Sequence, residues 1–216
     1  MNQLIQILII APPILLALTF HEYAHAYVAN RLGDPTAKDM GRLTLNPLVH
    51  LDLLGTAMLF IVHIGWAKPV PVNPLNFKNP KQDLLWVSLA GPGANLLLAL
   101  IFGLACRVLG IEGWFSPEPG LMGLVKFMIV FGLLINIVLA VFNLFPIPPL
   151  DGSKILMGLI PRQFEQQLLP FMRYGTTILI VLIVIGFVGK IDILGGLINP
   201  FLSFFSRLFA GIDLTF

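Results

Sequence analysis

Long apolar runs separated by short polar stretches make up most of the chain. The runs lie at roughly 4–29, 51–66, 84–109, 122–145, 174–189 and 193–211. A helix needs about 20 consecutive apolar residues to cross the hydrocarbon core of a bilayer, and most of these runs reach or approach that length. The pattern predicts an all-α polytopic membrane protein with five to six hydrophobic segments. No soluble insert separates them, so we expect a single membrane-embedded domain over 1–216.

The positions of Lys and Arg predict which way the segments face. The stretch 31–82 contains six of these residues and the loop 146–173 contains three, whereas 1–10 and 110–121 contain none. Because Lys and Arg accumulate in cytoplasmic loops, we expect both basic stretches in the cytoplasm and the N-terminus outside. The compactness of the chain suggests a bacterial plasma membrane as the compartment.

The run 51–66 differs from the others because it is short and has basic residues on both sides. If it were a full span, the later basic loops would fall outside. We therefore expect it to enter the membrane and return on the cytoplasmic side, or to lie buried against the other helices. The prolines and valines of 66–73 predict an extended segment, not a helix. Such a segment beside an active site is able to pair with an unwound substrate chain.

Composition agrees with a membrane-embedded chain. Charged residues make up 11% of the 216 residues and hydrophobic residues 57%, whereas a soluble domain carries about 25% charged residues. We therefore expect membrane lipids around the protein. The net charge of only +2 gives no reason to expect a nucleic-acid partner. The lone Cys106 has no second cysteine to pair with, so we expect a small buried side chain.

Two histidines and a glutamate lie inside the first apolar run, where such residues are costly and indicate function. His21, Glu22 and His25 form the pattern His-Glu-x-x-His. Positions i and i+4 of a helix share a face, so the two histidines are able to bind one zinc ion together. Glu22 then lies beside the metal, where it can accept a proton from water. A helix from Leu4 rises about 26 Å to His21, which places the histidines near the cytoplasmic edge of a core about 30 Å thick.

A catalytic zinc site usually takes three protein ligands, so the histidine pair needs a partner. The run 122–145 passes from outside to inside and is followed by three prolines, after which Asp151 arrives at about the depth of His21. Asp-Gly is also a common turn pair, which leaves a turn residue as the alternative interpretation of Asp151. The incomplete histidine pair at matching depth favours the ligand interpretation.

Three motifs, in this order, resemble those of one protein family. They are His21-Glu-Tyr-Ala-His25, Ala90-Gly-Pro-Gly-Ala-Asn95 and Asn143-Leu-Phe-Pro-Ile-Pro-Pro-Leu-Asp-Gly152. Over roughly residues 10–155 the chain resembles the site-2 protease family of intramembrane zinc metalloproteases. It resembles a compact form, without the PDZ insert of larger members. A catalytic core is then expected over about 4–155, followed by C-terminal helices over about 165–216.

The resemblance implies a zinc-dependent endopeptidase that hydrolyses peptide bonds within or near the transmembrane segments of substrate proteins. It implies one zinc ion per chain, with His21, His25 and Asp151 as ligands. It also implies that Glu22 is the catalytic base and that Asn143 helps to hold the substrate or the oxyanion.

Two other functions compete with a protease. A metal-ion transporter also places His and Asp at membrane depth, but it normally needs polar residues along its path on both sides of the membrane. The outer halves of these runs are almost wholly apolar, which counts against transport. A non-catalytic membrane scaffold is the other alternative, and the intact Glu22 argues against it.

Other polar residues in apolar surroundings have structural interpretations. We expect His50 to order a turn, with a substrate or outer metal-site contact as the alternative. We expect His63 to be packed and hydrogen-bonded, and Asn95 to form an interhelical hydrogen bond beside the small residues 91–93. Glycines and a proline break the run 193–211. Three alternatives remain for this run: it spans, lies on the surface, or packs between copies of a homo-oligomer.

Overall fold

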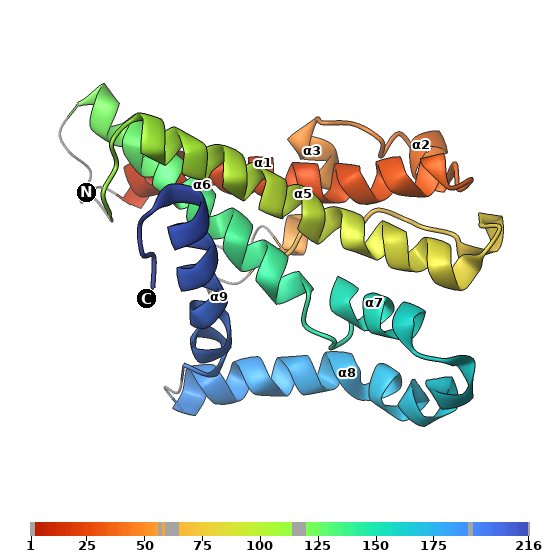
Figure 1. Ribbon diagram of the computed structural model, residues 1–216. Coiled ribbons are helices and arrows are strands. Elements are labelled where there is room, and N and C mark those ends of the chain that lie inside the picture. The colour runs from red at the N-terminus through yellow and green to blue at the C-terminus, as the bar shows by residue number, and fades with distance from the viewer. Residues whose placement is uncertain (1–2, 56–57, 59–64, 114–119, 190–191, 216) are drawn as a thin grey trace.

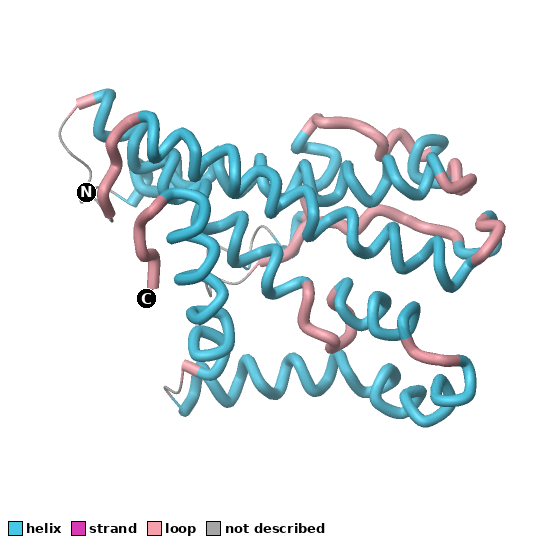
Figure 2. The backbone as a smooth tube through the Cα atoms, in the orientation of Figure 1, coloured by secondary structure: helices cyan, strands magenta, loops and turns pink. Residues whose placement is uncertain are grey.

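The computed structural model describes residues 3–55, 58, 65–113, 120–189 and 192–215 (Figure 1). The helices are, in order, α1 (Gln3–Arg31), α2 (Thr36–Asp39), α3 (Pro47–His50), the 3-10 helix η1 (Pro74–Asn76), α5 (Pro80–Val108), α6 (Leu121–Asn143), α7 (Asp151–Leu159), α8 (Arg162–Gly189) and α9 (Ile193–Ala210). Loops connect them, and the described residues contain no strand, only one isolated β-bridge (Figure 2). Within these residues, α5, α6, α8 and α9 are long and apolar enough to cross a membrane. The predicted all-α polytopic fold is confirmed.

Helices α1, α5 and α6 form a bundle in which small residues bring the helices close together (Figure 1). Ala17, Ala26 and Ala29 of α1 have no exposed surface. On α6, a Cβ atom added to Gly132 would lie 2.7 Å from the ring of Phe102 on α5. Membrane helices gain little by hiding apolar side chains from lipid, so they depend on close packing, which small residues permit.

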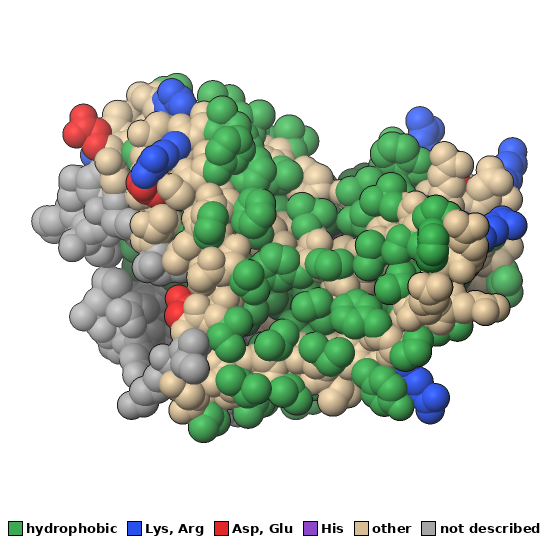
Figure 3. Space-filling view, turned by 60° about the horizontal axis from the view of Figure 1, so that its bottom comes forward, with side chains coloured by type: hydrophobic (Ala, Val, Ile, Leu, Met, Phe, Trp, Pro, Cys, Tyr) green, Lys and Arg blue, Asp and Glu red, His purple; other side chains and the backbone are tan. Residues whose placement is uncertain are grey.

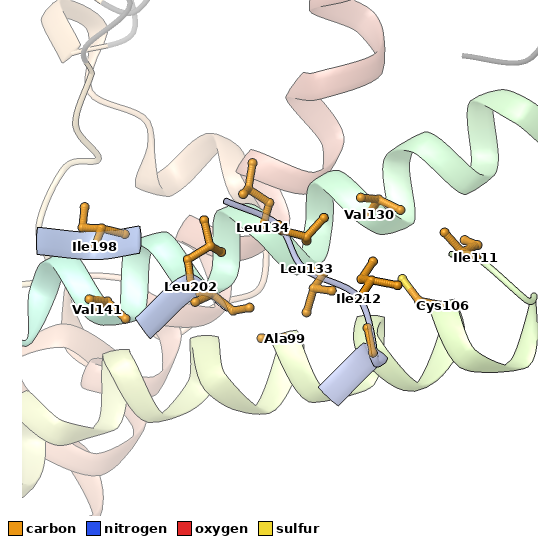
Figure 4. Close-up of a cluster of buried hydrophobic side chains, with 13 residues drawn as sticks. Ala99, Cys106, Ile111, Val130, Leu133, Leu134, Val141, Ile198, Leu202 and Ile212 are labelled. Carbon is orange, nitrogen blue, oxygen red and sulfur yellow. The ribbon is translucent and has the colours of Figure 1, made fainter. Parts of the chain in front are cut away.

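The main apolar core lies between α5, α6 and α9 (Figure 4). Leu133 of α6 and Leu202 of α9 have no exposed surface there. Cys106 is buried in the same core, as its apolar surroundings predicted. Helix α9 is therefore an integral part of the bundle as well as long enough to span. The three alternatives for 193–211 stay predictions, and its buried face packs against α5 and α6 of the same chain.

The end of α9 is fastened to the end of α5. Arg107 of α5 donates hydrogen bonds from Nε to the carbonyl of Phe209 at 2.7 Å and from Nη2 to the carbonyl of Leu208 at 2.9 Å. These are carbonyls of the last turn, which have no partner within their own helix. A Cβ atom added to Gly103 would lie 2.6 Å from the Cβ of Phe209. The contact therefore needs both the arginine and the glycine.

Helix α8 stands apart from the bundle along most of its length (Figure 1). Only 11% of its apolar stretch is buried, against 44% for α6. It approaches the loop after α6 at Gly175, where an added Cβ atom would lie 2.3 Å from the ring of Pro148. Figure 3 shows hydrophobic side chains spread over one face of the molecule. The helix begins at Arg162, near the position of about 165 expected for the C-terminal helices and well before the apolar run 174–189. The polar helix formers Gln and Glu extend it towards the N-terminus.

The two basic stretches lie at the same end of the bundle, as the distribution of Lys and Arg predicts. The Lys81 ammonium pairs with Glu165 at 2.5 Å and also reaches the carbonyl just before α8. The stretch 31–82 and the loop 146–173 are therefore joined by direct contacts. The start of α1 and the end of α5 lie at the opposite end (Figure 1).

The two ends of the run 51–66 lie side by side, because Leu51 and Ala67 form an isolated antiparallel bridge. The chain thus leaves and returns at one place, as expected for a segment that does not cross the membrane. The course of residues 56–57 and 59–64, and with it the expected packing of His63, lies outside the described residues.

Asp34 fastens the extended segment after this run to the end of α1. Its carboxylate has no exposed surface and accepts hydrogen bonds from the N–H of Asn73 and the amide of Asn76, both at 2.7 Å, and from the hydroxyl of Thr36 at 2.5 Å. Residues 68–73 form neither helix nor strand, which agrees with the expectation that 66–73 is not a helix. Burial alone would raise the pKa of Asp34, but the donors outweigh burial and hold the pKa below its ordinary value of 3.8.

We predict that Asp34→Asn destabilises the protein in a pH-dependent way. An amide nitrogen would face donors, and the unmade buried hydrogen bonds cost about 1–3 kcal/mol. The pKa of Asp34 is lower in the folded than in the unfolded state. The wild type therefore keeps this stabilisation above about pH 4 and loses it as the pH falls through the lowered pKa. Thermal unfolding in detergent should show a gap between wild type and variant that narrows on acidification; a gap independent of pH would contradict this role.

Candidate metal centre

Three side chains from two distant parts of the chain meet in a buried site. His21 and His25 come from α1, and Asp151 is the first residue of α7. The Nε2 atoms of the two histidines lie 3.0 Å apart, and Oδ2 of Asp151 lies 3.2 Å from Nε2 of His21 and 3.1 Å from Nε2 of His25. Each residue is less than a tenth exposed. The structure thus brings together the three residues that the sequence predicts as metal ligands.

Two glycines of α7 allow Asp151 to reach this place. A Cβ atom added to Gly152 would lie 2.2 Å from the carbonyl oxygen of Leu144, so only a glycine lets α7 start directly against the end of α6. In the last turn of α7, a Cβ atom added to Gly158 would lie 2.6 Å from the Cβ of Leu85 on α5. Helix α7 is therefore held close to both α5 and α6, and the position of Asp151 follows from that packing.

Hydrogen bonds on the far side of each imidazole fix its orientation. Nδ1 of His25 lies 2.7 Å from the carbonyl oxygen of Val87, and Nδ1 of His21 lies 2.7 Å from Oδ1 of Asn95. Both partners are oxygen acceptors, so each Nδ1 carries a proton and the neutral ring presents the lone pair of Nε2 to the site. Histidine ligands of protein-bound zinc almost always make an outer hydrogen bond of this kind.

The donor atoms fit a zinc ion. Two lone pairs and a carboxylate oxygen that point at one spot repel each other unless positive charge lies between them, either a metal ion or protons on Nε2. Donors held about 2.0–2.1 Å from a tetrahedral zinc ion lie about 3.3 Å apart, close to the 3.0–3.2 Å observed. Two histidines and a carboxylate form a common donor set for catalytic zinc, which keeps a fourth position open.

Gly91 of α5 leaves the space that the two rings occupy. A Cβ atom at this position would lie 2.4 Å from Nε2 of His25 and 2.6 Å from Cε1 of His21. The motif at 90–95 therefore contributes twice to the site, because Gly91 gives the space and Asn95 gives the hydrogen bond. The interhelical bond expected of Asn95 is present, but its contact with His21 was not foreseen.

Glu22 lies next to the extended segment. Its side chain is buried, and Oε2 accepts a hydrogen bond from the N–H of Val70 at 2.8 Å. On the same segment, the carbonyl of Lys68 accepts a hydrogen bond from Nη2 of Arg42 at 2.6 Å. The sequence placed this segment near the active site but gave no sign of either contact, because both join residues far apart in the chain.

Two further residues singled out from the sequence make local hydrogen bonds. Nδ2 of Asn143 donates to the carbonyl of Leu139 in its own helix at 2.9 Å, and its role in holding a substrate stays a prediction. His50 is buried, and its Nε2 donates to the carbonyl of Thr44 at 2.9 Å. This bond agrees with the turn-ordering role expected for His50.

Two polar side chains near the site were not predicted. Nζ of Lys154 lies 3.6 Å from Oδ1 of Asp151, the carboxylate oxygen that faces away from the histidines. Asn136 of α6 accepts a hydrogen bond from Asn95 at 2.9 Å. A polar residue inside an apolar run is costly unless it is paired, and this signal in 122–145 could have identified Asn136.

Comparisons with known proteins point to metallopeptidases. Residues 118–187 match the sequence model of peptidase family M50. YwhC of Bacillus subtilis is 41% identical over 171 residues, which cover 79% of this chain and 78% of that protein. Rip2 of Mycolicibacterium smegmatis is 33% identical over 176 residues (79% of this chain, 64% of that protein), and MJ0611 of Methanocaldococcus jannaschii is 39% identical over 137 residues (63% of each). All three carry "zinc metalloprotease" in their names. No solved structure matches the chain.

We predict that Gly91→Ala weakens zinc binding by about tenfold or more, whereas Gly93→Ala leaves it unchanged. The Cβ atom of the first variant displaces the imidazole of His25, but nothing lies within 4 Å of a Cβ atom at Gly93. Zinc content and competition with a chelator in detergent measure the difference. Equal zinc affinity in the two variants would show that the space at Gly91 is not needed by the metal.

Proposed function

The chain belongs to peptidase family M50, the site-2 proteases, and is a zinc metallopeptidase; we propose that it cuts peptide bonds within or next to the transmembrane segments of other proteins. The observation that carries this proposal is the convergence of His21, His25 and Asp151, beside Glu22, in a bundle of membrane helices. A protease built in this way meets its substrates inside the bilayer or at its edge.

We propose His21, His25 and Asp151 as the protein ligands of one zinc ion. Their buried donors, the outward hydrogen bonds of both rings and the space at Gly91 support this assignment. Zinc bound there supplies a Lewis acid that polarises a peptide carbonyl and lowers the pKa of water to about 7.

Glu22 is proposed as the general base. It follows the first histidine in the pattern His-Glu-x-x-His, in which the glutamate serves as the general base beside the metal. The N–H of Val70 binds Oε2 and limits the rotation of the carboxylate. In this role Glu22 takes a proton from the attacking water and later gives it to the leaving amine, a contribution of typically 10²–10⁴-fold.

The extended segment 68–73 is proposed to receive the substrate. A helical substrate keeps its carbonyls in hydrogen bonds, so it must unwind before attack, and an unwound chain needs new backbone partners. The segment is suited to that task because Arg42 holds its start and Asp34 holds its end, while Val70 between them touches Glu22. Substrates with helix-weakening residues near the cut are therefore favoured.

We propose that the site opens towards the cytoplasm of a bacterial cell, with the start of α1 outside. The accumulation of Lys and Arg in 31–82 and 146–173 supports this orientation. The proposed partners are membrane lipids and transmembrane protein or peptide substrates.

We predict that Glu22→Gln binds about one zinc per chain, like the wild type, yet cuts no substrate. The amide keeps the shape of the side chain but does not accept the proton. By contrast, His21→Ala, His25→Ala and Asp151→Ala are expected to lose both zinc and activity. Zinc is measured per mole of purified protein, and cleavage is measured with single-span reporter proteins in proteoliposomes.

The two readouts test different parts of the proposal. Cleavage by Glu22→Gln at the wild-type rate would rule out the general-base role. If Asp151→Ala retained zinc at wild-type affinity, Asp151 would be ruled out as a ligand, whether or not the variant still cut substrates.

A further inference from the structure

A chain of buried amides links α6 to the metal centre. Nδ2 of Asn136 donates to the carbonyl of Gly132 at 2.8 Å, and Oδ1 of Asn136 accepts from Nδ2 of Asn95 at 2.9 Å. The same Nδ2 of Asn95 also donates to the carbonyl of Ala17 at 3.0 Å. Oδ1 of Asn95 then accepts from Nδ1 of His21 at 2.7 Å. Neither asparagine has any exposed surface.

The backbone carbonyls of Gly132 and Ala17 determine which group donates and which accepts in every one of these hydrogen bonds. A carbonyl only accepts, so the amide nitrogen of Asn136 must face Gly132, and its oxygen is left for Asn95. For the same reason the amide nitrogen of Asn95 faces Ala17 as well as Asn136. Its oxygen is therefore turned to His21, and that oxygen requires a proton on Nδ1.

We propose that Asn95 and Asn136 are positioning residues that fix the tautomer and the ring orientation of His21, so that Nε2 points at the metal. This inference rests on the proposed function, in which His21 is a zinc ligand. Asn95 acts directly on the ring, and Asn136 acts through Asn95.

The two histidines are oriented by different means. Nδ1 of His25 is held by the backbone carbonyl of Val87, which comes with helix α5 itself. The ring of His21 instead depends on two side chains that α5 and α6 contribute. Substitutions that leave the backbone intact can therefore disturb His21 and spare His25.

The test is the zinc dissociation constant of the full-length protein in detergent, measured by competition with a chelator. Asn95→Leu, which is similar in size but has no acceptor, is expected to weaken zinc binding by about 10–100-fold. Asn136→Leu is expected to weaken it less, because the carbonyl of Ala17 still holds Asn95. The double variant should bind zinc no more weakly than Asn95→Leu alone, since the remote amide acts only through the near one.

The absorption spectrum of the cobalt-substituted protein is a second measurement, and a loss of stability alone does not change it. The visible absorption of Co²⁺ in the site should change in Asn95→Leu, because the His21 ring turns. Ser206→Ala is the matched control. Ser206 is a buried polar residue of α9 that bonds to Ser203 and Leu214 and makes no contact with the metal centre. This control should lower the unfolding temperature and leave zinc affinity and the cobalt spectrum unchanged.

Unchanged zinc affinity and an unchanged cobalt spectrum in Asn95→Leu would overturn the proposal. Losses that add in the double variant would overturn the part that concerns Asn136. If Asn95→Leu does not fold, Asn95→Ser repeats the test, because its shorter side chain does not reach His21. Full zinc binding by His21→Ala is a separate outcome, which would overturn the ligand assignment itself and not merely the positioning role.

Discussion

Two imidazole lone pairs and a carboxylate meet at one buried point, and much of the surrounding fold follows from the need to hold them there. Both rings are buried within the protein, so protein groups must supply the hydrogen bond on the far side of each ring. Helix α5 supplies both of these bonds, through the carbonyl of Val87 and the amide oxygen of Asn95, and its Gly91 leaves the space that the rings occupy. Helix α5 contributes none of the proposed ligands, yet it determines how the two histidine rings are oriented.

Close approach between helices is the second requirement, and glycines, which have no side chain, make it possible. Gly132 admits the ring of Phe102, and Gly152 lets α7 begin against the end of α6. In lipid such contacts hold helices together by packing and hydrogen bonds, because the hydrophobic effect contributes little between them. The same contacts that stabilise the bundle therefore set the positions of the donors.

Local spacing and membrane depth made the central part of the site predictable. The His-Glu-x-x-His pattern placed two histidines on one helix face, and the prolines before Asp151 placed it at matching depth. Contacts that depend on how helices rotate against each other were not predictable, because periodicity does not fix that rotation. The bond from Val70 to Glu22 and the amide chain through Asn136 are of this kind. The apolar run 174–189 covers only the second part of α8, because hydropathy identifies the apolar part of a helix and not its polar first turns.

His25 and Asp151 are 126 positions apart in the chain, yet their side chains touch. An ion bound between them would cross-link residues far apart in the chain and so close a very long loop. Closing such a loop restricts the unfolded chain more than the folded one. The same ion that polarises a peptide bond would then tie the first helix to α7. A chelator would remove the chemistry and the cross-link together, leaving two imidazole lone pairs and a carboxylate that repel each other unless protons take the place of the metal. In this fold the cofactor would also be a structural cross-link.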